Sequence, residues 1–118
     1  MLKYFSVYEF DSPDVDGSGR LMDKNFLLLL DELRERFGKP IHITSGYRTK
    51  EHNETLKNAS KNSSHLLGLA CDIAITDSKD RYKIIRLALK LGINRIGVSG
   101  RFLHLDVDTS KPNAIWTY

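Results

Sequence analysis

Apolar residues recur along this chain with two periods, which are typical of helices and of strands. The helical period is clearest over residues 23–37, where leucine and phenylalanine return every three or four positions until Gly38 and Pro40 end the run. A second amphipathic helix is predicted over residues 78–91, with Gly92 as its stop. A shorter helix is expected after Thr49, because threonine caps helix N-termini.

The alternating period predicts strands over residues 41–45, 69–76, 95–98 and 101–107. Only Ser99 and Gly100 separate the last two, which is the spacing of a tight hairpin. Wound parallel folds need strict alternation of strands and helices, so two adjacent strands favour the α+β class. We therefore expect a small, central, largely antiparallel sheet with flanking helices.

Composition agrees with one ordinary globular domain. The chain has 118 residues, 41% hydrophobic and 28% charged, which suits a single domain over residues 1–118 with one core. Cys71 is the single cysteine, so it has no partner within the chain, and its apolar neighbours predict a small buried hydrophobe.

Charge and hydropathy exclude two classes of partner. The net charge is +3 and the basic residues are interleaved with acids, so there is no basic stripe of the kind that binds nucleic acid. No apolar stretch is long enough to span a membrane, and the first ten residues lack the apolar core of a signal peptide. We expect a monomer that is made in the cytoplasm.

Polar residues on the predicted strands are candidates for chemistry. Asp72 shares a strand face with small alanines, where an ionised carboxylate is costly unless it is paired or ligated. His104 lies on the strand face opposite to that of Leu103 and Leu105, and Asp106 lies on the same face as His104. His65 precedes Asp72 by one loop that can bend at Gly68. Two imidazoles, one carboxylate and an open fourth position define a catalytic zinc site, although a solvated sheet face and a loop histidine would give the same pattern.

Three segments in order carry a family resemblance: SGYR at residues 45–48, SSHLLGLACD at residues 63–72 and HLD at residues 104–106. They resemble the signature segments of the zinc D-Ala-D-Ala carboxypeptidases, a family that includes VanX- and VanY-type enzymes and phage L-Ala-D-Glu endopeptidases. The resemblance spans roughly residues 5–106. Three ordered motifs together are far more specific than any one of them.

The resemblance implies roles for five of these residues. His65, Asp72 and His104 would bind zinc on the sheet face. Arg48 would hold a substrate carboxylate or carbonyl and offset negative charge that develops during catalysis. Ser45 would orient this loop or donate a hydrogen bond to the substrate.

The chain departs from the pattern of many relatives at one position. Those relatives carry a glutamate three residues before the last histidine, whereas this chain has Arg101 there, followed by Phe102. Neither side chain can act as a base at neutral pH. Asp106 is the nearest remaining carboxylate, either as general base or as the group that orients a zinc ligand.

The sequence therefore predicts a zinc metallopeptidase that hydrolyses peptide bonds in peptidoglycan stem peptides, as an endolysin-like carboxypeptidase or endopeptidase. The lack of a signal peptide suits a phage or prophage enzyme that reaches the cell wall after release. The alternative is a catalytically weak or silent zinc module that binds wall peptides or forms part of a phage particle, and the missing glutamate supports it.

Overall fold

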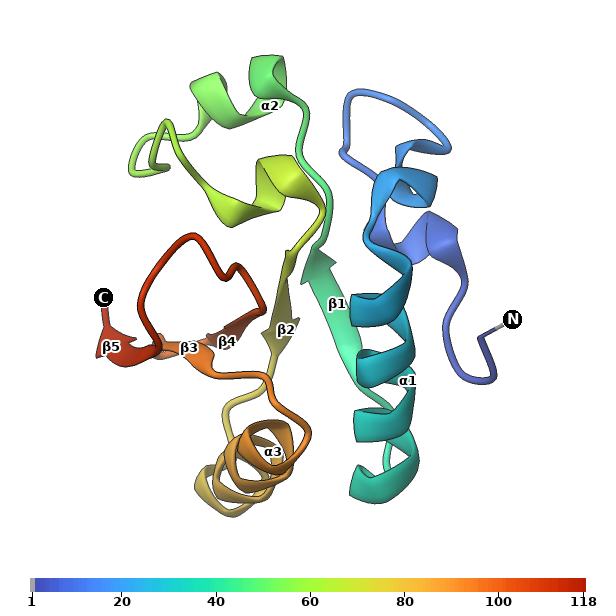
Figure 1. Ribbon diagram of the computed structural model, residues 1–118, viewed down its shortest axis with the longest axis vertical. Coiled ribbons are helices and arrows are strands. Elements are labelled where there is room, and N and C mark those ends of the chain that lie inside the picture. The colour runs from blue at the N-terminus through green and yellow to red at the C-terminus, as the bar shows by residue number, and fades with distance from the viewer. Residues whose placement is uncertain (1) are drawn as a thin grey trace.

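A five-stranded sheet forms the centre of the protein, as seen in a computed structural model that describes residues 2–118 (Figure 1). Its strands follow the order β1-β2-β4-β3-β5. Their bounds are β1 His42–Ser45, β2 Ala70–Ala74, β3 Arg95–Val98, β4 Phe102–Asp106 and β5 Ala114–Thr117.

The strand pairing confirms the predicted fold class. β1 with β2, β2 with β4 and β3 with β4 are antiparallel pairs, and the predicted β3–β4 hairpin is present. The sequence predicted no strand in the carboxy-terminal tail. The tail forms β5, which runs parallel to β3 at the edge of the sheet. The protein is α+β with a largely antiparallel sheet.

Capping residues set the helix boundaries where the sequence predicts them. Helix α1, Lys24–Phe37, begins where the Asp23 carboxylate accepts from the Phe26 amide, and it ends at Gly38 with φ of 80°. Helix α2, Lys50–Thr55, is capped by Thr49. Helix α3, Ser78–Lys90, starts after Asp77, which accepts from two backbone amides.

Three short 3-10 helices lie outside the longer elements: η1 Val7–Phe10, η2 Ser18–Leu21 and η3 Ser64–Leu67. η3 was not predicted, because a single turn leaves no hydrophobic period to detect. It ends at Gly68, whose φ of 71° lies in the left-handed region. The Gly68 carbonyl accepts from the Asp23 amide, which joins η3 to the start of α1.

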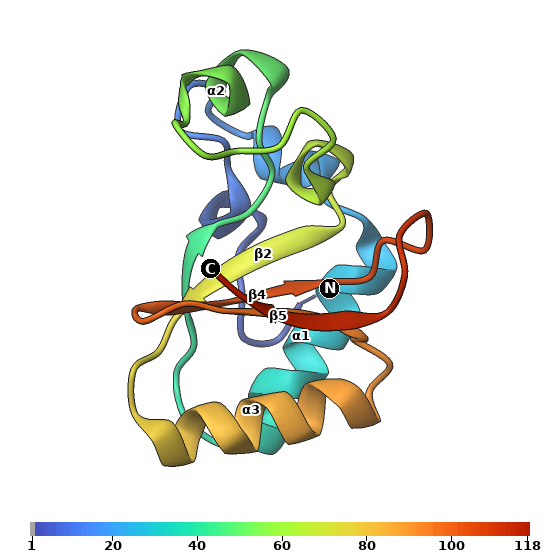
Figure 2. The same cartoon turned by 90° about the vertical axis from the view of Figure 1, so that its left-hand side faces the viewer.

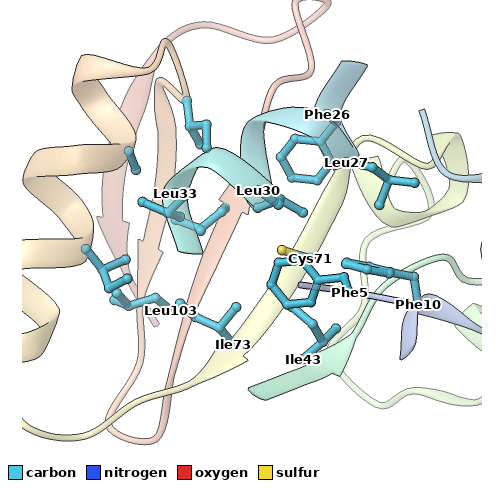
Figure 3. Close-up of a cluster of buried hydrophobic side chains, with 14 of the residues drawn as sticks. Phe5, Phe10, Phe26, Leu27, Leu30, Leu33, Ile43, Cys71, Ile73 and Leu103 are labelled. Carbon is cyan, nitrogen blue, oxygen red and sulfur yellow. The ribbon is translucent and has the colours of Figure 1, made fainter. Parts of the chain in front are cut away.

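The sheet separates a hydrophobic layer from a polar one. Helices α1 and α3 cover one face, while α2 lies on the opposite side (Figure 2). Between the sheet and α1, Leu30 and Leu33 pack toward Ile73 and Leu103 (Figure 3). Cys71 is fully buried in this core, as predicted, and burial raises the pKa of its thiol. Within residues 2–118, no helix is long and apolar enough to cross a bilayer.

Gly68 is expected to be far less tolerant of a side chain than Gly38, although both have positive φ. At Gly38 an added Cβ meets nothing within 4 Å, so Gly38→Ala should cost only the left-handed backbone penalty of about 1 kcal/mol. At Gly68 the Cβ would lie 2.6 Å from the Leu21 carbonyl oxygen, so Gly68→Ala should cost clearly more. Urea unfolding of both variants measures the difference, and equal losses would contradict it.

Candidate metal centre

The His65 imidazole is fixed by the loop that follows β1. Its Nδ1 lies 2.7 Å from the Gly46 carbonyl oxygen, and because a carbonyl only accepts, Nδ1 carries the proton and donates. Nε2 is then unprotonated and faces Asp72, at 3.4 Å from Oδ1. The Arg48 amide donates to the His65 carbonyl, so backbone and side chain are held by the same loop.

His104 meets Asp72 across neighbouring strands. The two residues are direct partners in the antiparallel pairing of β2 and β4, which places their side chains on the same face. His104 Nδ1 lies 3.0 Å from Asp72 Oδ1. On the other side of the ring, Nε2 donates to Asp106 Oδ2 at 2.6 Å. That second bond fixes the neutral tautomer that leaves Nδ1 free for a ligand.

The three predicted ligand residues therefore converge. One donor atom from each of His65, Asp72 and His104 lies within 4.8 Å of the other two. Ligands bound at about 2.0–2.2 Å around a tetrahedral zinc ion are roughly 3.4 Å apart, so the observed separations of 3.0 and 3.4 Å to the carboxylate oxygen fit such an ion. Two nitrogens and one oxygen, all buried, are a donor set suited to zinc.

Electrostatics at the centre favour an ionised carboxylate. Burial alone would raise the pKa of Asp72, but the close contacts with the imidazoles of His104 and His65 lower it below its ordinary value. Burial likewise lowers the pKa of His104, but Asp106 and Asp72 outweigh it and the net shift is upward. The Asp72 carboxyl is thus held in its charged form although it is buried.

Asp106 lies on the Nε2 side of the His104 ring, away from the Nδ1 atom that faces Asp72. It is 1% exposed. Its Oδ2 accepts from His104, while its Oδ1 accepts from Arg95 Nε at 2.8 Å and from the Asp108 amide at 3.1 Å. Both carboxylate oxygens are therefore occupied by hydrogen bonds within the protein.

Arg48 reaches the centre from the loop after β1, and Ser45 is the last residue of that strand. Its Nε donates to Ser45 Oγ at 3.2 Å and one terminal nitrogen lies 3.4 Å from Asn53 Oδ1. The other terminal nitrogen is 3.5 Å from Asp72 Oδ2, the oxygen that the histidines leave free. Ser45 thus acts through Arg48, by fixing the direction of the guanidinium group.

A cavity of about 360 Å³ opens onto these residues. Its lining includes the aromatic side chains of Phe102, Trp116 and Tyr118, and small residues between α2 and η3 such as Asn58 and Ser60. Sequence reasoning missed Arg95, Trp116 and Tyr118 as parts of this site. Their contribution depends on the pairing of β5 with β3, for which the tail carries no periodic signal.

Asp108 connects the two segments that carry the histidines. It is buried, and its Oδ2 accepts from Ser64 Oγ at 2.7 Å, next to His65. Its Oδ1 accepts from the amide and hydroxyl of Ser110. Sequence reasoning assigned Asp108 no role. The contacts show that it anchors η3 to the end of β4.

A family model described as peptidase M15 matches residues 5–108, which include all three candidate ligands. The chain belongs to the peptidase M15 family. Members of the M15 family are zinc-dependent, and the convergent His-Asp-His group is where this M15 chain could hold a metal ion. The resemblance drawn from the three sequence segments is confirmed. Among curated proteins, no match to this M15 chain is found.

The Asp108 carboxylate should make the free energy of unfolding depend on pH in the acidic range. Burial raises its pKa, but hydrogen bonds from Ser110 and Ser64 outweigh this and lower it from 3.8 to about 2. A carboxyl group whose pKa is lower in the folded state than in the unfolded state stabilises the fold. This stabilisation is complete above the unfolded-state pKa and is lost as the pH falls through the folded-state pKa. Asp108→Asn should therefore lose less stability than the parent between pH 4 and pH 2. Urea midpoints across that range measure this, and parallel curves would contradict it.

Proposed function

We propose that this protein is a zinc metallopeptidase that hydrolyses peptide bonds in peptidoglycan stem peptides. The observation that carries the proposal is the convergence of two unprotonated imidazole nitrogens and one carboxylate oxygen beside an open cavity. Membership of a peptidase family gives the reaction class. A zinc ion held there would lower the pKa of bound water and polarise the scissile carbonyl.

Arg48 is the residue best placed to bind substrate. Its guanidinium group faces the centre, and its side chain keeps 14% of its surface exposed, so it can accept a new partner. Guanidinium binds carboxylates and polarised carbonyl oxygens through paired hydrogen bonds. Stem peptides carry free carboxylates close to their scissile bonds. Arg48 would therefore orient the peptide and offset negative charge on the carbonyl oxygen.

For Asp106, the contacts favour the orienting role over that of general base. Both of its oxygens already accept hydrogen bonds, and Arg95 offsets its charge. A carboxylate that accepts from a metal-binding histidine fixes the ring and raises its basicity as a ligand. Asp106 would act through His104, as a positioning residue.

A silent zinc module is the second candidate, and one observation favours it. Among residues 2–118, the acids that line the cavity are Asp72 and Asp106, and each is engaged by neighbouring side chains. Neither is free to take a proton from water. Such a module would bind wall peptides through the same cavity, or form part of a phage particle, without cleaving its ligand.

The setting of the reaction is also a proposal. An endolysin-like enzyme, encoded by a phage or prophage, would be released on lysis and would then meet its substrate in the cell wall. The mildly basic surface, with a net charge of +3, is suited to an anionic wall.

Loss of either candidate ligand histidine should abolish stoichiometric zinc binding. His65→Ala and His104→Ala each remove one of three donors, whereas His42→Ala alters an exposed histidine outside the centre. Metal analysis after dialysis against limiting zinc should give about one ion per chain for the parent and for His42→Ala. Parent-like zinc content in either ligand variant would refute the assignment.

Digestion of purified peptidoglycan distinguishes the two candidate functions. The zinc-loaded parent should release muropeptide fragments whose masses report carboxypeptidase or endopeptidase cleavage. Arg48→Ala should reduce cleavage by about 100-fold or more, because removal of one such electrostatic group typically costs this much. Arg48→Lys should retain part of the activity through its charge. Unchanged muropeptides after incubation with the zinc-loaded parent would instead support the silent module.

A further inference from the structure

The edge strand β5 places the sole tryptophan of the chain against a candidate metal ligand. Gly97 on β3 is the direct partner of His104 on β4 and of Trp116 on β5. The three positions therefore form one row across the same face of the sheet. The ring centres of Trp116 and His104 are 5.4 Å apart, with 51° between the planes.

Gly97 makes this contact possible. A Cβ at position 97 would lie 2.8 Å from Trp116 Nε1, so the indole occupies the space where a side chain would stand. The tryptophan ring crosses the glycine and reaches the histidine, two strands away. Any side chain at this position would push the indole away from the imidazole.

Arg95 links the indole to the carboxylate behind His104. Its guanidinium carbon lies 4.9 Å from the centre of the Trp116 ring, within the range of a cation–π interaction. The same guanidinium group donates from Nε to Asp106 Oδ1. His104, Asp106, Arg95 and Trp116 thus form a closed ring of contacts, in which each group touches the next.

We propose that Trp116 and Arg95 are positioning residues for the metal ligand His104. Asp106 fixes the ring at one edge through a hydrogen bond, but one bond leaves the imidazole free to tilt about it. Trp116 packs against the ring and stops that tilt. Arg95 holds both supporting groups in place. This inference rests on the proposed metal-dependent function, because it assigns the contacts to keeping Nδ1 aimed at the ion.

The expected effect is a loss of zinc affinity without loss of the fold. Changing groups that support a ligand typically costs 10- to 100-fold in metal affinity. Trp116→Ala and Arg95→Met should each weaken zinc binding by about 10- to 100-fold. Trp116→Phe and Arg95→Lys, which keep a ring and a charge, should recover part of it.

The test is zinc affinity, measured by competition with a chromophoric chelator on the full chain. Ile115→Ala is the matched control, because Ile115 lies on the same strand but is 56% exposed. Urea unfolding of the zinc-free proteins shows whether each variant is folded. Parent-like affinity in both Trp116→Ala and Arg95→Met would overturn the inference while leaving the metal centre intact.

Tryptophan fluorescence tests in a second way whether the indole packs against the imidazole that binds the ion. Zinc should produce a saturable change in Trp116 emission in the parent, because the ion alters the charge of the ring packed against the indole. His104→Ala should abolish this change, and Ile115→Ala should retain it. A parent that binds zinc with no change in emission would overturn the inference. A parent that binds no zinc by either method would overturn the proposed function together with it.

Discussion

The structure depends on keeping one ionised carboxylate, that of Asp72, buried in the middle of a sheet. Withdrawal of such a group from water costs several kcal/mol unless charged and hydrogen-bonding partners replace the solvent. Here two histidines share one of its oxygens and Arg48 approaches the other. The partners come from β4, from η3 and from the loop after β1, so the segments around the site are arranged to compensate a single charge.

The alternation of side chains along two strands keeps this polar centre apart from the core. On β2, Cys71 and Ile73 face the helices while Asp72 faces the cavity. On β4, Leu103 and Leu105 face the helices while His104 faces the cavity. Because the period is two, a slip of one residue in either strand would bury the charges in the hydrophobic layer. Core burial therefore fixes the register on which the ligand geometry depends.

Much of this arrangement could be read from local sequence patterns. The alternation around Asp72 and His104 indicated that both point away from the leucines, and caps such as Asp23 and Thr49 marked helix starts. These signals are local, so they can be recognised without knowledge of the partner strand. His65 lies in a loop without periodicity, where it was a candidate through its distance from Asp72, and the motif resemblance gave it the role of a zinc ligand.

What could not be read depends on contacts between distant segments. The pairing of Asp72 with His104 joins residues 32 positions apart, and no local pattern specifies that register. Whether Asp106 faces the cavity or lies behind the histidine depends on Arg95, which comes from the neighbouring strand. The parallel pairing of β5, and with it the place of Trp116, follows from the edge that β3 leaves open.

The hydrogen bond from His65 to the Gly46 carbonyl has a consequence for the order of assembly. Gly46 is packed against Phe10, and the Tyr47 amide donates to the Phe10 carbonyl, so the amino-terminal segment supports the loop that aims His65. During synthesis the centre gains its second imidazole only when β4 has left the ribosome. Asp72 and His65 thus leave the ribosome before His104, and the centre is complete only once that residue has emerged.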